Sequence, residues 1–148
     1  MSAEAVWSGS QMDAFLEQAR VPVRLACNGG SGHPVLASLW YLPEEGKLWC
    51  ATQQSASVTT LLARDARCAF EVSVEAPPYR GIRGRALATL HDERGEEILR
   101  RLIHRYLGDS RPGLACRLLA RAGCETAIEI EPQTRVSWDY TERMEQAV

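Results

Sequence analysis

Lysine is almost absent from this chain of 148 residues: Lys47 is the only one among its 17 basic residues, and the other 16 are arginine. The formal net charge is −2 at pH 7. Nucleic acids are held largely by positive charge placed on their phosphates, so this balance argues against a nucleic-acid partner. Arginine, in contrast, suits planar and bidentate contacts with a single anionic group.

Long apolar runs are also missing. No stretch approaches the roughly 20 residues of a membrane-spanning helix, and the first residues lack a basic region followed by an apolar one. The sequence therefore predicts a cytoplasmic protein with no membrane partner. Its five cysteines show no CxxC or Cys/His spacing, so they indicate reduced thiols that behave as small hydrophobes. They are Cys27, Cys50, Cys68, Cys116 and Cys124.

The motifs of several enzyme classes are lacking. There is no Gly-x-Ser-x-Gly elbow, no P-loop and no dinucleotide fingerprint. The three histidines, His33, His91 and His104, share no metal-binding or catalytic spacing. The sequence thus predicts neither unaided hydrolysis nor a metal site, and it identifies no catalytic side chain.

The apolar patterns that are present predict one mainly β, α+β domain over residues 1–148. Residues 35–42 are apolar almost throughout, which is typical of a strand buried on both faces, and a turn joins them to a strand at 47–52 as a hairpin. Residues 126–132 alternate as a half-exposed strand does. Strands linked in this way indicate an antiparallel sheet of six or seven strands, closed into a small barrel with helices outside. The other predicted strands cover 21–27, 67–75, 79–90 and 135–140, and the helices cover 11–19, 58–62, 99–106 and 111–123.

Seven hydroxyl or carboxamide side chains lie between Thr52 and Thr60, at the start of the predicted short helix. The free N–H groups and the dipole of a helix N-terminus attract anions, and the hydroxyls of Thr52, Ser55 and Ser57 could add donors. A phosphate group fits this arrangement. The alternative interpretation is that Ser55 or Ser57 only caps the helix.

These segments together resemble a known superfamily. The stretch GHPVLASLWYLPEEGKLWCATQQSASVTTLLARDARCAFEVS, followed by APPYRGIRGRA, resembles the pyridoxamine 5′-phosphate oxidase-like superfamily of flavin-binding split β-barrels. The ending EIEPQTRVSWDYTERM is similar to its small flavin- or deazaflavin-dependent branch. The resemblance covers residues 20 to 144. It implies a homodimer with two cofactor sites at the subunit interface.

The family's phosphate-binding stretch commonly reads Ser-x-Lys-x-x-Asn-Leu-x-x-Asp-Pro-Arg. The residues that match it are Ser55, Leu61, Asp65 and Arg67, whereas Ser57, Thr60 and Ala66 replace its lysine, asparagine and proline. An arginine and a lysine on the preceding strand also help to bind FMN in the family's oxidase. His33 and Ser38 stand at those two positions. The resemblance therefore implies a phosphate cradle of main-chain amides and hydroxyls, with any positive charge supplied by Arg80 or Arg83. If these arginines point elsewhere, the alternative is a vestigial site or one adapted to another ligand.

The resemblance implies a flavin-dependent oxidoreductase in which FMN carries out hydride or electron transfer on a small-molecule substrate. The residues expected to contact the cofactor fall into three groups. Ser38, Leu39 and Trp40 would run beside the isoalloxazine ring, Thr52, Gln53, Ser55 and Ser57 would hold the phosphate, and Trp138 would cover the ring from the other subunit.

Two alternatives stay open at this point. One is a reductase that uses the deazaflavin coenzyme F-420, and the other is a non-enzymatic protein that binds flavin or haem. For haem, His33 is the one candidate ligand, because its glycine-rich turn would place it at the mouth of the barrel. Oxidation of pyridoxamine phosphate itself is not expected, because the final segment RVSWDYTERM lacks the histidine of the family's Arg-x-His element.

Overall fold

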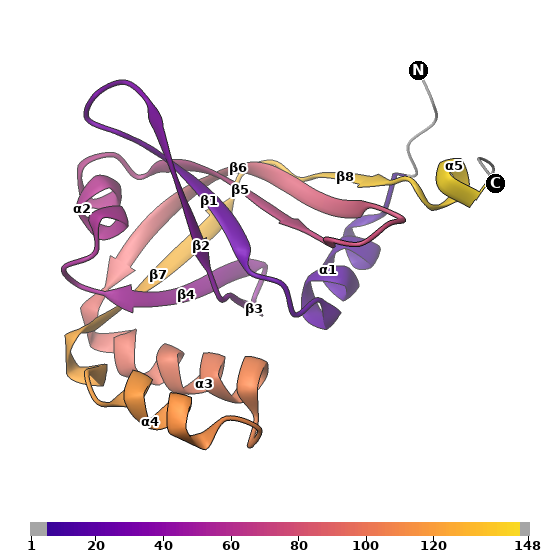
Figure 1. Ribbon diagram of the computed structural model, residues 1–148. Helices are drawn as coiled ribbons and strands as arrows, with labels where there is room; N and C mark the ends of the chain where they lie inside the picture. Colours follow the sequence, from indigo (N-terminus) through magenta and orange to yellow (C-terminus); the bar gives the residue numbers. More distant parts are fainter. Residues whose placement is uncertain (1–5, 146–148) are drawn as a thin grey trace.

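The sheet of this protein consists of antiparallel strand pairs. The computed structural model describes residues 6–145, in which eight strands pair in the order β2-β1-β5-β6-β7-β4-β3, with β8 beside β6. Figure 1 shows how the sheet curls around a shared interior. The predicted α+β class and the antiparallel, helix-flanked sheet are confirmed. The strands are β1 (Val23–Asn28), β2 (Pro34–Leu39), β3 (Leu42–Glu44), β4 (Lys47–Gln53), β5 (Arg67–Ser73), β6 (Arg80–His91), β7 (Glu125–Pro132) and β8 (Val136–Asp139).

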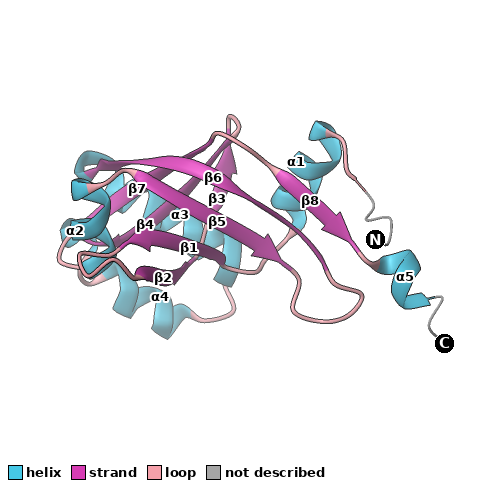
Figure 2. Ribbon diagram, turned by 90° about the horizontal axis from the view of Figure 1, so that it is seen from above, coloured by secondary structure: helices cyan, strands magenta, loops and turns pink. Residues whose placement is uncertain are grey.

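The helices lie around the sheet rather than inside it. In Figure 1, α3 and α4 lie side by side next to β4 and β7, whereas α1 and α2 lie at opposite ends of the sheet. Figure 2 shows β8 reaching beyond the barrel, with α5 at its end. None of the helices within residues 6–145 is long and apolar enough to span a membrane. The helices are α1 (Gly9–Gln18), α2 (Ser57–Arg64), α3 (Gly95–Leu107), α4 (Pro112–Leu119) and α5 (Thr141–Glu145), and two 3₁₀ turns are η1 (Asp92–Arg94) and η2 (Ala122–Cys124).

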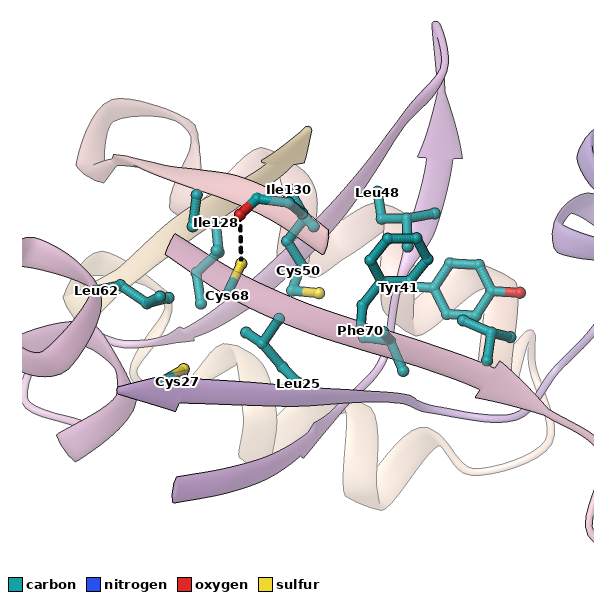
Figure 3. Packing of buried hydrophobic residues seen from close by; sticks show 14 of the residues in the cluster. Leu25, Cys27, Tyr41, Leu48, Cys50, Leu62, Cys68, Phe70, Ile128 and Ile130 are labelled. Carbon is teal, nitrogen blue, oxygen red and sulfur yellow. Dashed lines mark hydrogen bonds between the residues drawn. The ribbon is translucent and has the colours of Figure 1, made fainter. Parts of the chain in front are cut away.

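Alternate residues of the strands point into the barrel and form its core (Figure 3). Leu25 of β1, Ile128 and Ile130 of β7 and Tyr41, which follows β2, are almost completely buried. The Tyr41 hydroxyl donates a hydrogen bond to the carbonyl of Leu16 in α1 at 2.7 Å. A buried phenol thus keeps its polar group satisfied and links the core to the first helix.

Three of the five cysteines contribute to this core as small hydrophobes, as the sequence predicted. Cys27, Cys50 and Cys68 are buried free thiols. The Cys68 Sγ donates to the carbonyl of Ala86 at 3.6 Å, the contact drawn dashed in Figure 3. Burial raises the pKa of Cys68 to about 12, so this thiol stays protonated near neutral pH and is a poor nucleophile.

The predicted hairpin between residues 35–42 and 47–52 is confirmed only at its turn, where the short β3 pairs with β4 and Leu42 lies opposite Trp49. The rest of the predicted first strand is wrong: β2 ends at Leu39 and pairs with β1. The chain leaves the sheet at Trp40 because Tyr41 turns into the core. The predicted burial of residues 35–42 on both faces is wrong as well: β2 is a sheet edge, and Leu36 is 76% exposed. An apolar strand without a cover in its own subunit cannot be distinguished by composition from one in the core.

The predicted half-exposure of residues 126–132 is also wrong. All residues of β7 from Glu125 to Ile130 are buried except Glu129, which is partly buried, because α3 covers the outer face of the strand. The apolar face that the sequence predicted for α3 makes this contact. Ile98 and Leu102 pack against Trp49 and Ala127, and Leu99 and Ile103 pack toward α4 and η2.

Gly95 allows α3 to lie this close to the sheet. A Cβ atom at Gly95 would come within 2.2 Å of the carbonyl oxygen of Glu125, so Gly95→Ala must push the helix away from β7. We expect this substitution to lower the free energy of unfolding by about 1–3 kcal/mol, as overpacking does. Gly113→Ala is the matched control: nothing lies within 4 Å of that site in α4, so we expect a neutral or slightly stabilising effect. Urea unfolding measures both variants. If the close contact did not exist, the two substitutions would change the free energy of unfolding by the same amount.

Candidate functional site

The hydroxyl-rich residues between Thr52 and Ser57 form the turn from β4 into α2. The interpretation that Ser55 or Ser57 caps this helix is wrong: the N-cap is Ala56, and no side chain bonds to the first turn. Both serine side chains are exposed, and neither hydroxyl has a hydrogen-bond partner within residues 6–145. The N–H groups of Ser57 and Val58 also lack an acceptor there. The start of α2 therefore offers free donors to an anion.

The turn η2, at the end of the α3–α4 segment, packs directly against this turn. The Gln54 N–H donates to the carbonyl of Cys124 at 2.8 Å, and the Gln54 side chain donates to the carbonyl of Glu125 at 3.2 Å. The Gln53 side chain reaches the carbonyl of Arg121 at 3.5 Å. These bonds place Arg121, which is distant in sequence, beside the hydroxyl-rich turn.

A groove of about 450 Å³ opens between the sheet and helices α3 and α4; we call it the helix-side groove. This volume is within the range of roughly 300–1,000 Å³ that is usual for small-molecule sites. One wall is flat, because the Trp40 ring stacks on Tyr106 with 5.0 Å between ring centroids and 6° between ring planes. The lining residues are Ser38, Leu39, Trp40, Ala51, Thr52, Gln53, Leu99, Leu102, Arg117, Leu118, Arg121 and Glu125.

The structure thus brings five of the predicted cofactor residues into one groove and adds two arginines that the sequence analysis did not select. Arg117 lies in the last turn of α4, Arg121 lies between α4 and η2, and both line the helix-side groove. Neither guanidinium has a carboxylate partner within residues 6–145. Their spacing in RLLAR was visible in the sequence, but only the fold shows which surface they face.

Glu125 is the one carboxylate that lines the groove. Only 6% of Glu125 is exposed, and burial raises its pKa, although the hydrogen bond from Gln53 and the charge of Arg121 act in the opposite direction. The Gln53 Nε2 donates to Glu125 Oε2 at 2.5 Å, while the Gln53 Oε1 is buried without a donor. The Gln53 amide and the Glu125 carboxylate thus form a polar, hydrogen-bonded part of the groove lining.

Three of the predicted site residues lie elsewhere in the subunit. Arg83 faces a second groove of about 770 Å³ on the outer surface of β1, β2, β5 and β6, which we call the sheet-face groove. The Arg83 guanidinium lies 5.4 Å from the centroid of the Trp138 ring, and Trp138 is only 8% exposed. Arg80 pairs across the β6–β8 ladder with Asp139. Arg83 pairs with Glu71 of β5. Glu71 is four residues, or about 13 Å, from Arg67, where β5 begins after α2. Within one subunit, these residues do not join the turn that contains Ser57.

The matched motif residues Asp65 and Arg67 bind each other. The Arg67 Nε and Nη2 donate to the Asp65 carboxylate at 3.0 and 2.8 Å, and Asn28 Nδ2 adds a third bond at 2.9 Å. These donors, Arg67 first, hold the pKa of the Asp65 carboxyl well below its usual range. The pair joins the end of α2 to β1 and β5, which is a structural role. His33 is exposed in the β1–β2 turn and lines neither groove.

No protein-family model and no curated protein matches the chain. Solved structures do match over most of its length. A conserved hypothetical protein from Mycobacterium tuberculosis has a TM-score of 0.78 at 21% identity, covering 97% of this chain and 92% of the other. An F-420 reductase has a TM-score of 0.72 at 19% identity, covering 88% and 98%. A pyridoxamine 5′-phosphate oxidase-like protein from Listeria innocua has a TM-score of 0.64 at 18% identity, covering 86% and 95%.

The chain therefore has the fold of the pyridoxamine 5′-phosphate oxidase-like superfamily, the split β-barrel that the sequence resemblance implied. The same fold occurs in a FAD-binding protein from Mesorhizobium loti and in HutZ, the heme storage protein from Vibrio cholerae, at 10% and 13% identity. At these identities the likeness concerns the fold, and function has to be argued from the groove.

The raised pKa of Glu125 leads to a testable pH dependence. An acid whose pKa is higher in the folded than in the unfolded protein costs stability once the pH rises above its unfolded value, near 4.5. We expect Glu125→Gln to raise the melting temperature by a few degrees at neutral pH and to have little effect below pH 4.5. Thermal melts across this range measure the difference, and a destabilised variant at neutral pH would contradict the assigned shift.

Proposed function

We propose that this protein is a flavin-dependent oxidoreductase that binds FMN in the helix-side groove, at the interface of a homodimer. The observation that carries the proposal is the combination of features in and beside this one groove. Trp40, as a flat wall, and the end of the edge strand β2 line the groove. Ser55 and Ser57 are not among its lining residues, but the uncapped start of α2 follows the lining residues Thr52 and Gln53 along the chain. A planar ring needs the first two features, and a phosphate needs the third.

The residues of the groove fit the two ends of such a cofactor. Leu39 and Trp40 offer apolar surface to a ring, and β2 pairs only with β1, so the main-chain groups on its other edge can bond to ring substituents. The free donors of Ser55 and Ser57 would receive the phosphate, with Thr52 and Gln53 between the two ends. The similar folds of an F-420 reductase and a FAD-binding protein support this choice of ligand.

When bound, FMN supplies the redox chemistry by accepting and donating a hydride or electrons at its ring. The protein's own residues would position the ring and exclude water from one of its faces. Trp40 suits that task because its stacking on Tyr106, whose hydroxyl bonds to the carbonyl of Val21 at 3.0 Å, fixes the plane of the wall. No acid or base from the protein is required for this step, which agrees with the absence of a catalytic side-chain constellation in the sequence.

The second subunit would cover the sheet-face groove. This groove is mainly apolar, and Leu36 and Val136 in it are 76% and 46% exposed, which is unusual for side chains that remain in water. Ser38 lines both grooves, so a second copy on the sheet face would close the open side of the helix-side groove. Arg80, Arg83 and Trp138 would then lie close to the subunit boundary.

A deazaflavin-dependent reductase is the second candidate, because the F-420 reductase is covered over 98% of its length by this chain. Haem binding has less support from the site: no histidine within residues 6–145 lines the helix-side or the sheet-face groove. The small-molecule substrate would enter beside the ring.

Cofactor titration tests the proposed function directly. We expect the purified protein to bind one FMN or one F-420 per subunit and to show quenching of tryptophan fluorescence. Trp40→Ala should weaken binding about tenfold, because a stacking wall is lost. Trp7→Ala is the control, since Trp7 packs on Phe15 away from the groove. A protein that takes up neither cofactor would refute the proposal.

The dimer can be tested separately with Leu36→Arg, which adds a positive charge to a groove that Arg24, Arg83 and Arg85 already line. We expect this variant to sediment as a monomer and to lose cofactor affinity by at least about tenfold, since a buried charge without an opposite partner is costly. Leu87→Arg is the matched control, because Leu87 is an exposed leucine outside both grooves. A wild-type protein that sediments as a monomer at high concentration would contradict the dimer.

A further inference from the structure

The proposed phosphate site lacks a positive charge of its own. Ser57 stands where the related motif has lysine, and Lys47, the sole lysine, pairs with Glu129 at 3.0 Å. Arg67 is bound to Asp65, and Arg83 stacks on Trp138. Neutral donors leave the net charge of a dianionic phosphate uncompensated, so a nearby cation would strengthen its binding.

Arg117 and Arg121 are the groups that can supply this charge. Arg117 lies in the last turn of α4 and Arg121 lies just after the helix, and both line the helix-side groove. Most arginines of the described chain bind a carboxylate, a carbonyl or an aromatic ring, but no such partner exists for these two guanidinium groups within residues 6–145. Two unpaired guanidinium groups at one groove form a site for a single oxyanion.

Main-chain hydrogen bonds place these arginines at the phosphate end of the groove. The Cys124 carbonyl accepts from the Gln54 N–H at 2.8 Å, so η2 and the turn before α2 are held together. Arg121 immediately precedes η2, and its own carbonyl receives the Gln53 side chain. The main chain of Arg121 therefore lies beside Gln53 and Gln54, the residues that precede Ser55, and Arg117 lies in the preceding last turn of α4.

We infer that Arg117 and Arg121 form an anion clamp that holds the phosphate of the cofactor against the start of α2. This inference rests on the proposed function and names the residues that replace the missing lysine. Glu125 is the one carboxylate among the described lining residues; it accepts a hydrogen bond from Gln53, and the charge of Arg121 acts on it although the two side chains form no ion pair. The groove thus carries two positive charges against one negative charge.

A comparison of FMN with riboflavin isolates the phosphate, because the two ligands share the ring and the ribityl chain. We expect the wild-type protein to prefer FMN, and Arg117→Gln and Arg121→Gln each to weaken FMN binding about tenfold while leaving riboflavin affinity unchanged. The double variant should lose most of the preference, and added salt should weaken FMN binding in the wild type only. For a deazaflavin cofactor, F-420 and its phosphate-free precursor form the equivalent pair.

Arg111→Gln is the matched control, because Arg111 is the exposed N-cap of the same helix and does not line the groove. Ser57→Lys in the double variant should restore part of the FMN preference. Three outcomes would overturn the clamp while leaving flavin binding intact. The ratio of FMN affinity to riboflavin affinity could stay unchanged in the double variant, or both ligands could lose affinity equally. The ratio could also collapse in Arg80→Gln or Arg83→Gln instead. A wild-type protein that binds none of these ligands would overturn the proposed function together with the clamp.

Discussion

The close contact between α3 and β7 is the constraint on which the rest of the site depends. With no side chain at Gly95, the start of α3 lies against the main chain of Glu125, and the apolar face of the helix then covers Trp49 and Ala127. This packing fixes α4 and η2 beside the end of β4, where the main chain of Cys124 bonds to that of Gln54. The helix-side groove lies between these two helices, the end of β4 and the end of the edge strand β2.

The distribution of charge follows from the same packing. The chain contains almost no lysine, and many of its arginines are used in ion pairs or in bonds to carbonyl groups. In a fold with an anion site, the positive charge can come from a helix instead of from the turn at the end of a strand, provided that the two lie side by side. In this protein η2 bonds to the turn before α2, so the main chain of Arg121 lies beside that turn.

The edge strand β2 connects two properties that would otherwise be unrelated. Its apolar side chains, Leu36 above all, are uncovered in the single subunit, and its last residues line the helix-side groove. Because Ser38 belongs to both grooves, association of subunits and binding of a planar ligand would take place on the two sides of the same strand. An exposed apolar edge strand is an aggregation hazard in a monomer, which is a physical reason for such a strand to be covered in an assembly.

The sequence by itself determined the local features. The apolar face of α3, the antiparallel strands, the burial of Cys27, Cys50 and Cys68, and the superfamily resemblance all follow from side-chain period and order along the chain. The hydroxyl-rich turn before α2 was also visible, since its residues are contiguous.

Only the tertiary structure decided which of these residues meet. The edge position of β2, the cover over β7 and the meeting of Arg121 with the turn at Gln54 arise from contacts between segments that are far apart in the chain. The physical reason is that an apolar strand or an arginine has the same local pattern whether it faces a partner, the core or a ligand. Only the packing of distant segments determines which of these neighbours the strand or the arginine contacts.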